Sequence, residues 1–296
     1  MQHRATGITQ AVRGLPRQCR SLRHPHRSNS MTQAHQGTAL ITGASSGIGA
    51  IYAQRLARRG FDLVLVARNR DRLNDFAKRI TDDTQRNVDV IAADLGDPHA
   101  LAEIEAKLRT DASITLLVNN AGVGTHKPLL ESDVDAMTRM IDLNVTALTR
   151  LTYAAVPGFV ARGRGAVINI SSIVAIGPEL LNGVYGGSKA FTLAFTQSLH
   201  HELADKGVQV QAVLPGATAT EFWDIGGLPL DNLPKEIVMS ASDLVDAALS
   251  GFDRREVVTI PSLHAAEEWD AYDAARRVML PHLSNSVVAA RYAVTH

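Results

Sequence analysis

From residue 38 onward, short and almost entirely apolar runs alternate with longer amphipathic stretches. Strands that helices cover on both faces have this composition, whereas half-exposed antiparallel strands alternate apolar and polar residues. The pattern therefore predicts an α/β fold, with a doubly wound parallel sheet of seven strands and helices on both faces. The predicted strands are Thr38–Thr42, Leu63–Ala67, Val88–Ala92, Thr115–Val118, Ala166–Ile170, Val208–Leu214 and Val257–Ile260. Predicted crossover helices include Ile48–Arg59, Asp97–Thr110, Val134–Val160 and Tyr185–Lys206.

The composition is that of one globular domain. The chain has 296 residues, of which 45% are hydrophobic and 20% charged, so it can form a substantial core. No apolar stretch approaches the roughly 18 residues that a membrane span needs, and we expect no span. We predict a single domain over residues 36–296, with a C-terminal extension at 261–296. Trp269, Tyr272 and Arg276 have helical spacing in that extension and could close a pocket or a subunit contact.

The first 30 residues differ from the rest of the chain. They hold six arginines, no acidic residue and the single cysteine, Cys19. We expect residues 1–35 to be a disordered basic extension, either an organellar transit peptide or an upstream extension of the reading frame before Met31. The remaining chain has 24 basic and 30 acidic residues, which argues against a nucleic-acid-binding body. One cysteine forms no internal disulfide, and the sequence predicts a cytoplasmic protein.

A glycine-rich turn follows the first predicted strand directly, and a helix pattern begins inside it. Without Cβ atoms the backbone turns tightly and approaches a pyrophosphate, which free N–H groups at the helix N-terminus can bind. The turn therefore predicts a nucleotide-binding site. Its candidate binding residues are Gly43, Ser45, Ser46, Gly47, Ile48 and Gly49.

The spacing of this turn is T-G-x-x-x-G-x-G, and two further motifs follow. One is N-N-A-G at residues 119–122, and the other is Y-x-x-x-K, formed by Tyr185 and Lys189. With these motifs the chain resembles the short-chain dehydrogenase/reductase family over nearly all of residues 38–260. The resemblance implies a Rossmann-like fold with strand order 3-2-1-4-5-6-7.

The end of the second strand indicates which nucleotide binds. A site that favours NAD places an acid there for the ribose hydroxyls, whereas one that favours NADP needs a cation for the extra phosphate. This strand ends at Arg68, whose guanidinium can pair with a phosphate. Arg70 and Arg72 add to the positive field. We therefore expect NADP(H) to be favoured over NAD(H).

The Tyr185–Lys189 pair supplies proton chemistry. The two residues are four apart in a helix-compatible stretch, so their side chains share one face. Hydride transfer to or from an alcohol carbon needs a proton donor or acceptor, and a free phenol with a pKa near 10 is a poor base at neutral pH. We expect the ammonium and an oxidised nicotinamide to lower the pKa of Tyr185. The resemblance implies that Lys189 also binds the nicotinamide ribose.

The resemblance assigns roles to further residues. It implies that Ser172 orients the substrate carbonyl and that Asn144 helps to hold a water near the lysine. Ser172 is preferred to Ser171 because of its offset from Tyr185. On the cofactor, the resemblance places Asp94 at the adenine, and it implies further contacts by Asn120, Ala121 and Gly122 on the adenosine side and by Pro215, Gly216 and Thr218 at the nicotinamide end.

Residues 217–240 are predicted to form a lid, because they combine several Pro and Gly with apolar side chains. We expect Phe222 and Trp223 in this lid to face an apolar substrate.

The predicted function is an NADP(H)-dependent oxidoreductase acting on a carbonyl or secondary alcohol. Two alternatives stay open, a 3-oxoacyl-thioester reductase, which a basic pocket rim would favour, and a nucleotide-sensing protein without turnover. We expect no metal site, because the eleven histidines show no H-E-x-x-H spacing. The resemblance also implies a homodimer or homotetramer, formed through helices 134–160 and 185–206.

Overall fold

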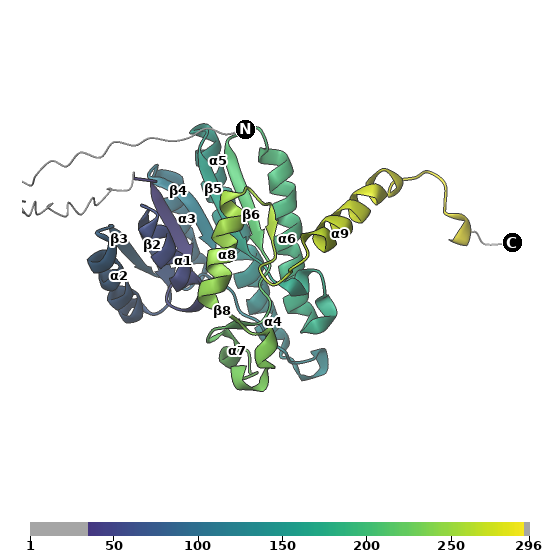
Figure 1. Ribbon diagram of the computed structural model, residues 1–296, viewed down its shortest axis with the longest axis horizontal. Helices are drawn as coiled ribbons and strands as arrows, with labels where there is room; N and C mark the ends of the chain where they lie inside the picture. Colours follow the sequence, from purple (N-terminus) through teal and green to yellow (C-terminus); the bar gives the residue numbers. More distant parts are fainter. Residues whose placement is uncertain (1–34, 293–296) are drawn as a thin grey trace, which may run out of the picture. The chain divides into compact units, whose positions relative to one another are not determined.

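Seven parallel strands form the central sheet in the order β3-β2-β1-β4-β5-β6-β9. The computed structural model describes residues 35–292 (Figure 1), so the predicted basic extension with Cys19 lies outside the described residues except for His35. Fold class and strand order are confirmed. The strands are β1 (Thr38–Thr42), β2 (Asp62–Ala67), β3 (Val88–Ala92), β4 (Ile114–Asn119), β5 (Gly165–Ile170), β6 (Val208–Val213) and β9 (Val258–Thr259).

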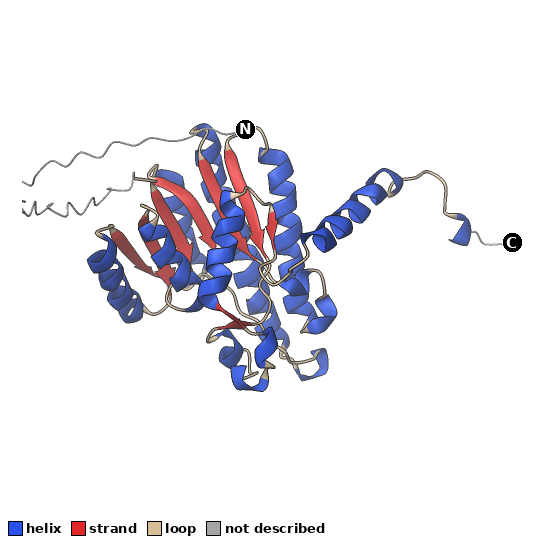
Figure 2. Cartoon of the chain, viewed as in Figure 1, coloured by secondary structure: helices blue, strands red, loops and turns tan. Residues whose placement is uncertain are grey.

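Helices cover both faces of this sheet (Figure 2). One face packs against α1 (Gly47–Arg58), α2 (Arg70–Thr84) and α8 (Ala241–Asp253). The other face packs mainly against α3 (Pro98–Thr110), α5 (Leu148–Ala161) and α6 (Gly183–Leu203). Helix α4 (Val134–Ile141) precedes α5, and a π-helical turn, η2 (Asp142–Ala147), joins the two.

Alternate strand residues enter opposite layers of the core. Ala39 and Ile41 of β1 belong to the layer under α1, whereas Leu40 belongs to the layer under α3 and α5. All three are fully buried. This explains the nearly continuous apolar runs, because each inner strand has helices above and below it.

The order of the strands positions the functional site. The chain winds outward from β1 to β3 and then returns to β4 on the other side of β1. In such sheets, ligands bind in the crevice outside the carboxyl ends of the strands, where the order reverses. The glycine turn follows β1, and the N-N-A-G motif begins at the end of β4. Both motifs therefore lie at the switch point.

The predicted lid consists of short elements. Strands β7 (Thr218–Ala219) and β8 (Met239–Ser240) pair in parallel and enclose the short helix α7 (Phe222–Ile225). The remainder contains 3-10 turns η5 (Leu230–Asn232) and η6 (Lys235–Ile237). The sequence predicted an irregular lid but not the small sheet, because two-residue strands are too short to show a period.

The C-terminal extension forms helix α9 (Ala266–Met279). Trp269 packs partly against the buried cluster of Leu193 and Leu214, and its ring lies 5.4 Å from that of Tyr272. The helical spacing is confirmed, whereas the role of these side chains stays a prediction. Among the helices in the described part of the chain, none has the length and apolarity to cross a bilayer.

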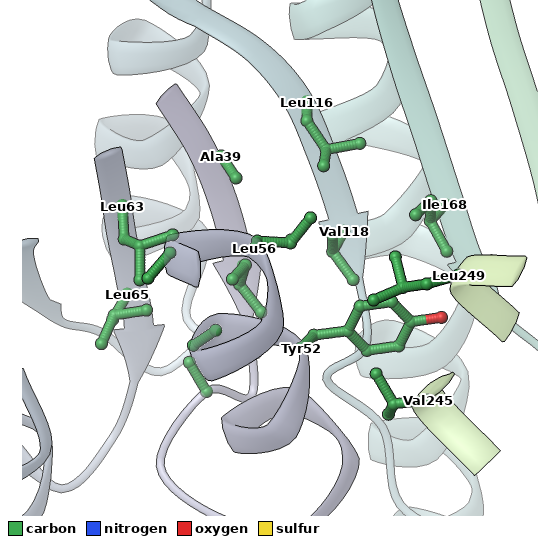
Figure 3. Close-up of a cluster of buried hydrophobic side chains, with 14 of the residues drawn as sticks. Ala39, Tyr52, Leu56, Leu63, Leu65, Leu116, Val118, Ile168, Val245 and Leu249 are labelled. Carbon is green, nitrogen blue, oxygen red and sulfur yellow. The ribbon is translucent and has the colours of Figure 1, made fainter. Parts of the chain in front are cut away.

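Tyr52 of α1 lies in the centre of a hydrophobic layer, beside Val118, Val245 and Leu249 (Figure 3). The side chain is fully buried, and its hydroxyl has no hydrogen-bond partner within residues 35–292. A buried, unpaired hydroxyl lowers stability because it has lost its hydration.

We expect Tyr52→Phe to raise the free energy of unfolding by about 1 kcal/mol in urea titrations. Tyr153→Phe is the matched control, because Tyr153 is 69% exposed and its hydroxyl stays hydrated. Loss of stability in Tyr52→Phe would mean that the hydroxyl contributes an interaction.

Candidate active site

The glycine turn connects β1 to α1 with an unusually close backbone path. Gly43 and Gly47 have φ angles of +65° and +54°, in the left-handed region that glycine tolerates best. A Cβ atom on Gly49 would lie 2.4 Å from the carbonyl oxygen of Gly43. Any side chain at Gly49 would therefore push the turn apart.

The N-terminus of α1 is suited to an anion. Its N-cap residue, Ser46, makes no side-chain capping hydrogen bond, and the first helical turn has no acidic residue. The first N–H groups of a helix have no partner inside the helix, and the helix dipole places positive charge there. The residues present therefore fit the pyrophosphate of a dinucleotide.

Asn120 of the N-N-A-G motif braces this turn. Its amide nitrogen donates to the carbonyl oxygens of Thr42 and Gly43, at 2.9 and 3.1 Å. In return, the Thr42 hydroxyl oxygen accepts from the backbone N–H groups of Asn120 and Ala121, each at 3.0 Å. The two motifs of the sequence thus hold each other in place.

The adenosine side lies beyond the carboxyl ends of β2 and β3. Arg68 is exposed directly after β2, where the sequence predicted a phosphate-binding cation. Arg72 makes a two-point ion pair with Glu221 of the lid. The Glu221 carboxylate therefore offsets part of the positive charge that the sequence predicted at this place. Asp94 follows β3 and accepts a hydrogen bond from the N–H of Gly96 at 2.9 Å.

Tyr185 and Lys189 are both buried on α6. The Lys189 ammonium lies 5.8 Å from the centre of the Tyr185 ring and donates to the carbonyl oxygen of Ile170 at 2.9 Å. Burial lowers the pKa of Lys189 to about 8, because a buried ammonium has lost its hydration. The helix thus places both groups of the motif in one buried spot.

The pKa of Tyr185 differs from the sequence-based expectation. Burial raises it to about 12, although a hydrogen bond with Ser172 acts in the opposite direction. The expected lowering by the ammonium is not found in the chain by itself, because Lys189 points to the carbonyl of Ile170 and the loss of hydration outweighs the other effects. The phenol is therefore protonated at neutral pH and can donate a proton.

The two serines after β5 face different groups. Ser172 interacts with the Tyr185 hydroxyl, whereas the Ser171 hydroxyl donates to the carbonyl oxygen of Lys189 at 2.8 Å. The structure thus places Ser172, and not Ser171, beside the Tyr185 hydroxyl, while the catalytic role of Ser172 stays a prediction. The Ser172 hydroxyl also contacts the carbonyl oxygen of Pro215 at 3.4 Å, which connects it to the turn after β6.

Asn144 lies in the π-helical turn η2 and is buried. Its side chain donates to the carbonyl oxygen of Val123 at 2.8 Å and accepts from the N–H of Val123 at 2.9 Å. It also donates to the Ser188 hydroxyl at 3.1 Å. A Cβ on Gly122 would lie 3.0 Å from the Asn144 oxygen and 3.4 Å from the Lys189 nitrogen, so both side chains converge on this glycine. π-Helical turns often occur at functional sites.

The turn after β6 connects the site to the lid. The buried Thr218 hydroxyl donates to the carbonyl oxygen of Gly216 at 3.1 Å. The Trp223 indole donates to the carbonyl oxygen of Thr218 at 2.9 Å. Trp223 therefore fixes the turn after β6 as well as lining the cavity under the lid, a role that the sequence did not indicate.

The lid closes over Tyr185. The ring of Phe222 lies 5.8 Å from that of Tyr185, and the cavity beside it measures only about 10 Å³. That volume holds about one water molecule. Sequence reasoning missed Gly124, Thr125 and His126 because they carry no motif of their own, although their position directly after N-N-A-G was an available signal. The cavity is lined by Gly124, Thr125, His126, Leu181, Phe222, Trp223, Gly226 and Leu228.

Comparison with known proteins decides the family. The model of the short chain dehydrogenase family matches residues 37–225. The chain belongs to the short-chain dehydrogenase/reductase family. It is thus an oxidoreductase that uses a nicotinamide dinucleotide, and the nucleotide-sensing alternative loses its support.

Three relatives of this short-chain dehydrogenase are informative. It is 50% identical to a short-chain dehydrogenase from Sphingobium yanoikuyae in complex with NADPH, with a TM-score of 0.84 over 86% of this chain and 100% of that one. It is 46% identical to a bulky-bulky ketone specific alcohol dehydrogenase from Comamonas testosteroni, with a TM-score of 0.80 over 86% of this chain and 98% of that one. It is 35% identical to the very-long-chain 3-oxoacyl-CoA reductase of Macaca fascicularis, over 69% of this chain and 66% of the relative.

Proposed function

We propose that this protein is an NADPH-dependent reductase of bulky apolar ketones and, in reverse, a secondary alcohol dehydrogenase. The observation that carries the proposal is the buried, protonated phenol of Tyr185, placed beside the Ser172 hydroxyl and under an apolar lid. The NADPH complex and the ketone specificity of its two relatives of known structure support it.

The cofactor supplies or accepts the hydride. The turn Gly43–Gly49 would hold its pyrophosphate through the free N–H groups of α1. Arg68 would bind the 2′-phosphate, which an arginine fork fits well, and Asp94 the adenine. Lys189 would bind the nicotinamide ribose, and Thr218 would contact the carboxamide.

The remaining chemistry belongs to this chain's side chains. Tyr185 donates a proton to the carbonyl oxygen during reduction, and the Ser172 hydroxyl orients that oxygen. At neutral pH the phenol of Tyr185 is protonated, as reduction requires. Oxidation of the alcohol requires the phenolate, so it gains from higher pH. Asn144 positions the loop that faces Lys189.

The surroundings of the pocket favour an apolar substrate. Several large apolar side chains are exposed on the segments that line the cavity or that adjoin the lining residues in the sequence. They are Leu129 (81% exposed), Leu130 (94%), Leu180 (60%) and Ile225 (68%). A 3-oxoacyl thioester carries an anionic nucleotide part, for which a basic rim would be expected. The macaque relative nevertheless keeps thioester reduction as the second candidate.

A substrate panel followed by NADPH absorbance tests the proposal. We expect diaryl and other bulky ketones to be reduced with NADPH at a kcat/KM at least tenfold above that for a 3-oxoacyl thioester.

NADH should be a poorer cofactor than NADPH. Arg68→Ala should lower the ratio of kcat/KM for NADPH to that for NADH by about tenfold or more, since one charge-assisted phosphate contact is worth about 1.5–3 kcal/mol. Arg79→Ala on α2 is the matched control. Preference for the thioester, or for NADH, would contradict the proposal.

Two further predictions from the sequence belong to this proposal. Tyr153 on α5 is 69% exposed and Phe191 on α6 36% exposed, which fits a homo-oligomer formed through these helices, to be measured by sedimentation. A cytoplasmic location also stays a proposal.

A further inference from the structure

One ion pair connects the lid to helix α2. Arg72 lies in the first turn of α2, and Glu221 directly precedes α7 of the lid. The guanidinium makes two hydrogen bonds to the carboxylate, at 2.7 and 3.0 Å. Both side chains are about half exposed, at 46% and 52%. The pair joins positions that are 149 residues apart in the chain.

This pair passes over the phosphate-binding turn. The Glu221 carboxylate also interacts with the Ser46 hydroxyl at the N-terminus of α1. The neighbouring Thr220 methyl lies 3.1 Å from the place where a Cβ on Gly47 would stand. The lid therefore rests on the turn itself.

The same segment carries the side chain that covers the catalytic phenol. Glu221 is followed by Phe222, whose ring packs on Tyr185. Phe222 in turn contacts Trp223, which is bound to the carbonyl of Thr218. Opening the lid for a dinucleotide or a substrate requires this segment to move away from α2, and the ion pair opposes that movement.

We propose that the Arg72–Glu221 pair is a strap that closes the lid over the phosphate-binding turn and sets the rate at which NADPH enters and leaves. The proposal rests on the cofactor site of the proposed function. In this proposal the strap closes the lid both before and after NADPH binds, so both rates require it to open. Its removal therefore accelerates association and dissociation together and leaves the affinity nearly unchanged.

The first test uses the protein without cofactor. Hydrogen exchange of the amides in residues 218–228 should be about three- to fivefold faster in Glu221→Gln and in Arg72→Gln, as expected for an exposed ion pair. The double charge reversal Arg72→Glu with Glu221→Arg should restore slow exchange. Unchanged exchange in both single variants would overturn the proposal.

The second test measures NADPH binding by stopped-flow fluorescence. We expect both rate constants to rise about three- to fivefold in Glu221→Gln, with the dissociation constant within about twofold of wild type. Simple structural damage would instead slow association and weaken affinity. Tighter binding through faster association alone, with an unchanged dissociation rate constant, would identify Glu221 as a competitor of the phosphate. Either result contradicts the strap.

The pair between Arg59 and Asp253 is the matched control. It also joins two elements by two hydrogen bonds, at 2.9 and 3.0 Å, with similar exposure of 37% and 58%. It lies at the opposite end of α1 from the turn, so Arg59→Gln should leave lid exchange and NADPH rates unchanged. If wild type bound no NADPH, the proposed function would fail. If binding is normal but insensitive to the strap variants, only the strap is wrong.

Discussion

Lys189→Met is expected to slow ketone reduction by roughly 10- to 100-fold while making the protein more stable. The loss of activity follows from the proposed role of Lys189, whose ammonium would donate charge-assisted hydrogen bonds to the cofactor ribose, each worth about 1.5–3 kcal/mol. The gain in stability follows from removing an ammonium that is buried and has only a carbonyl oxygen as hydrogen-bond partner among the described residues. Lys189→Met is therefore expected to lower the activity and to raise the free energy of unfolding.

The pH dependence of this stability gain follows from the lowered pKa. Lys189 has a pKa of about 8 in the folded protein, against 10.5 in the unfolded chain. Below pH 8 the amine is charged in both states, and burial costs the folded state about 3 kcal/mol. Between pH 8 and 10.5 the folded state loses its proton first, so wild-type stability rises with pH. Lys189→Met should remove this rise.

Lys206→Met is the control for this experiment. Lys206 follows the same helix, and its ammonium also donates to a backbone carbonyl, that of Glu202, at 2.7 Å. Its side chain is exposed, so we expect a change within about 0.5 kcal/mol at all pH values. Urea titrations at pH 7 and pH 10 measure the difference. A Lys189→Met protein that is less stable than wild type at pH 7 would show that the ammonium is favourably paired.

Local patterns explain how much of the fold could be predicted. The inner strands are covered on both faces, so apolar runs such as Thr38–Thr42 mark strands directly, and the motif residues follow from their position at strand ends. The edge strand β9 is shorter than predicted, because only two of its residues pair with β6. The sequence pattern shows where a strand lies, but not over how many residues it pairs with its neighbour.

Features that depend on distant contacts could not be predicted. The spacing of Tyr185 and Lys189 placed them together, but it did not show that Lys189 points to Ile170 or that burial dominates the pKa of Tyr185. The partner of Arg72 is 149 residues away in the lid, where no period identifies it. The π-helical turn at Asn144 also looked like ordinary helix in the sequence.

Tyr185→Phe is expected to have the largest effect on activity, a fall in kcat of roughly 10²- to 10⁴-fold, the usual contribution of a positioned general acid. Phenylalanine keeps the ring that packs against Phe222 and removes only the hydroxyl that interacts with Ser172. The fold and NADPH affinity should therefore be preserved. Tyr153→Phe, at an exposed ring on α5, should leave the rate unchanged.

The most direct measurement is a single turnover of enzyme-bound NADPH with a bulky ketone, followed by the loss of NADPH absorbance in wild type and in Tyr185→Phe. Our account predicts fast oxidation of NADPH in wild type and a rate at least 100-fold lower in the variant, with equal NADPH dissociation constants. A variant that binds NADPH normally and oxidises it at the wild-type rate would contradict the assignment of Tyr185 as the proton donor.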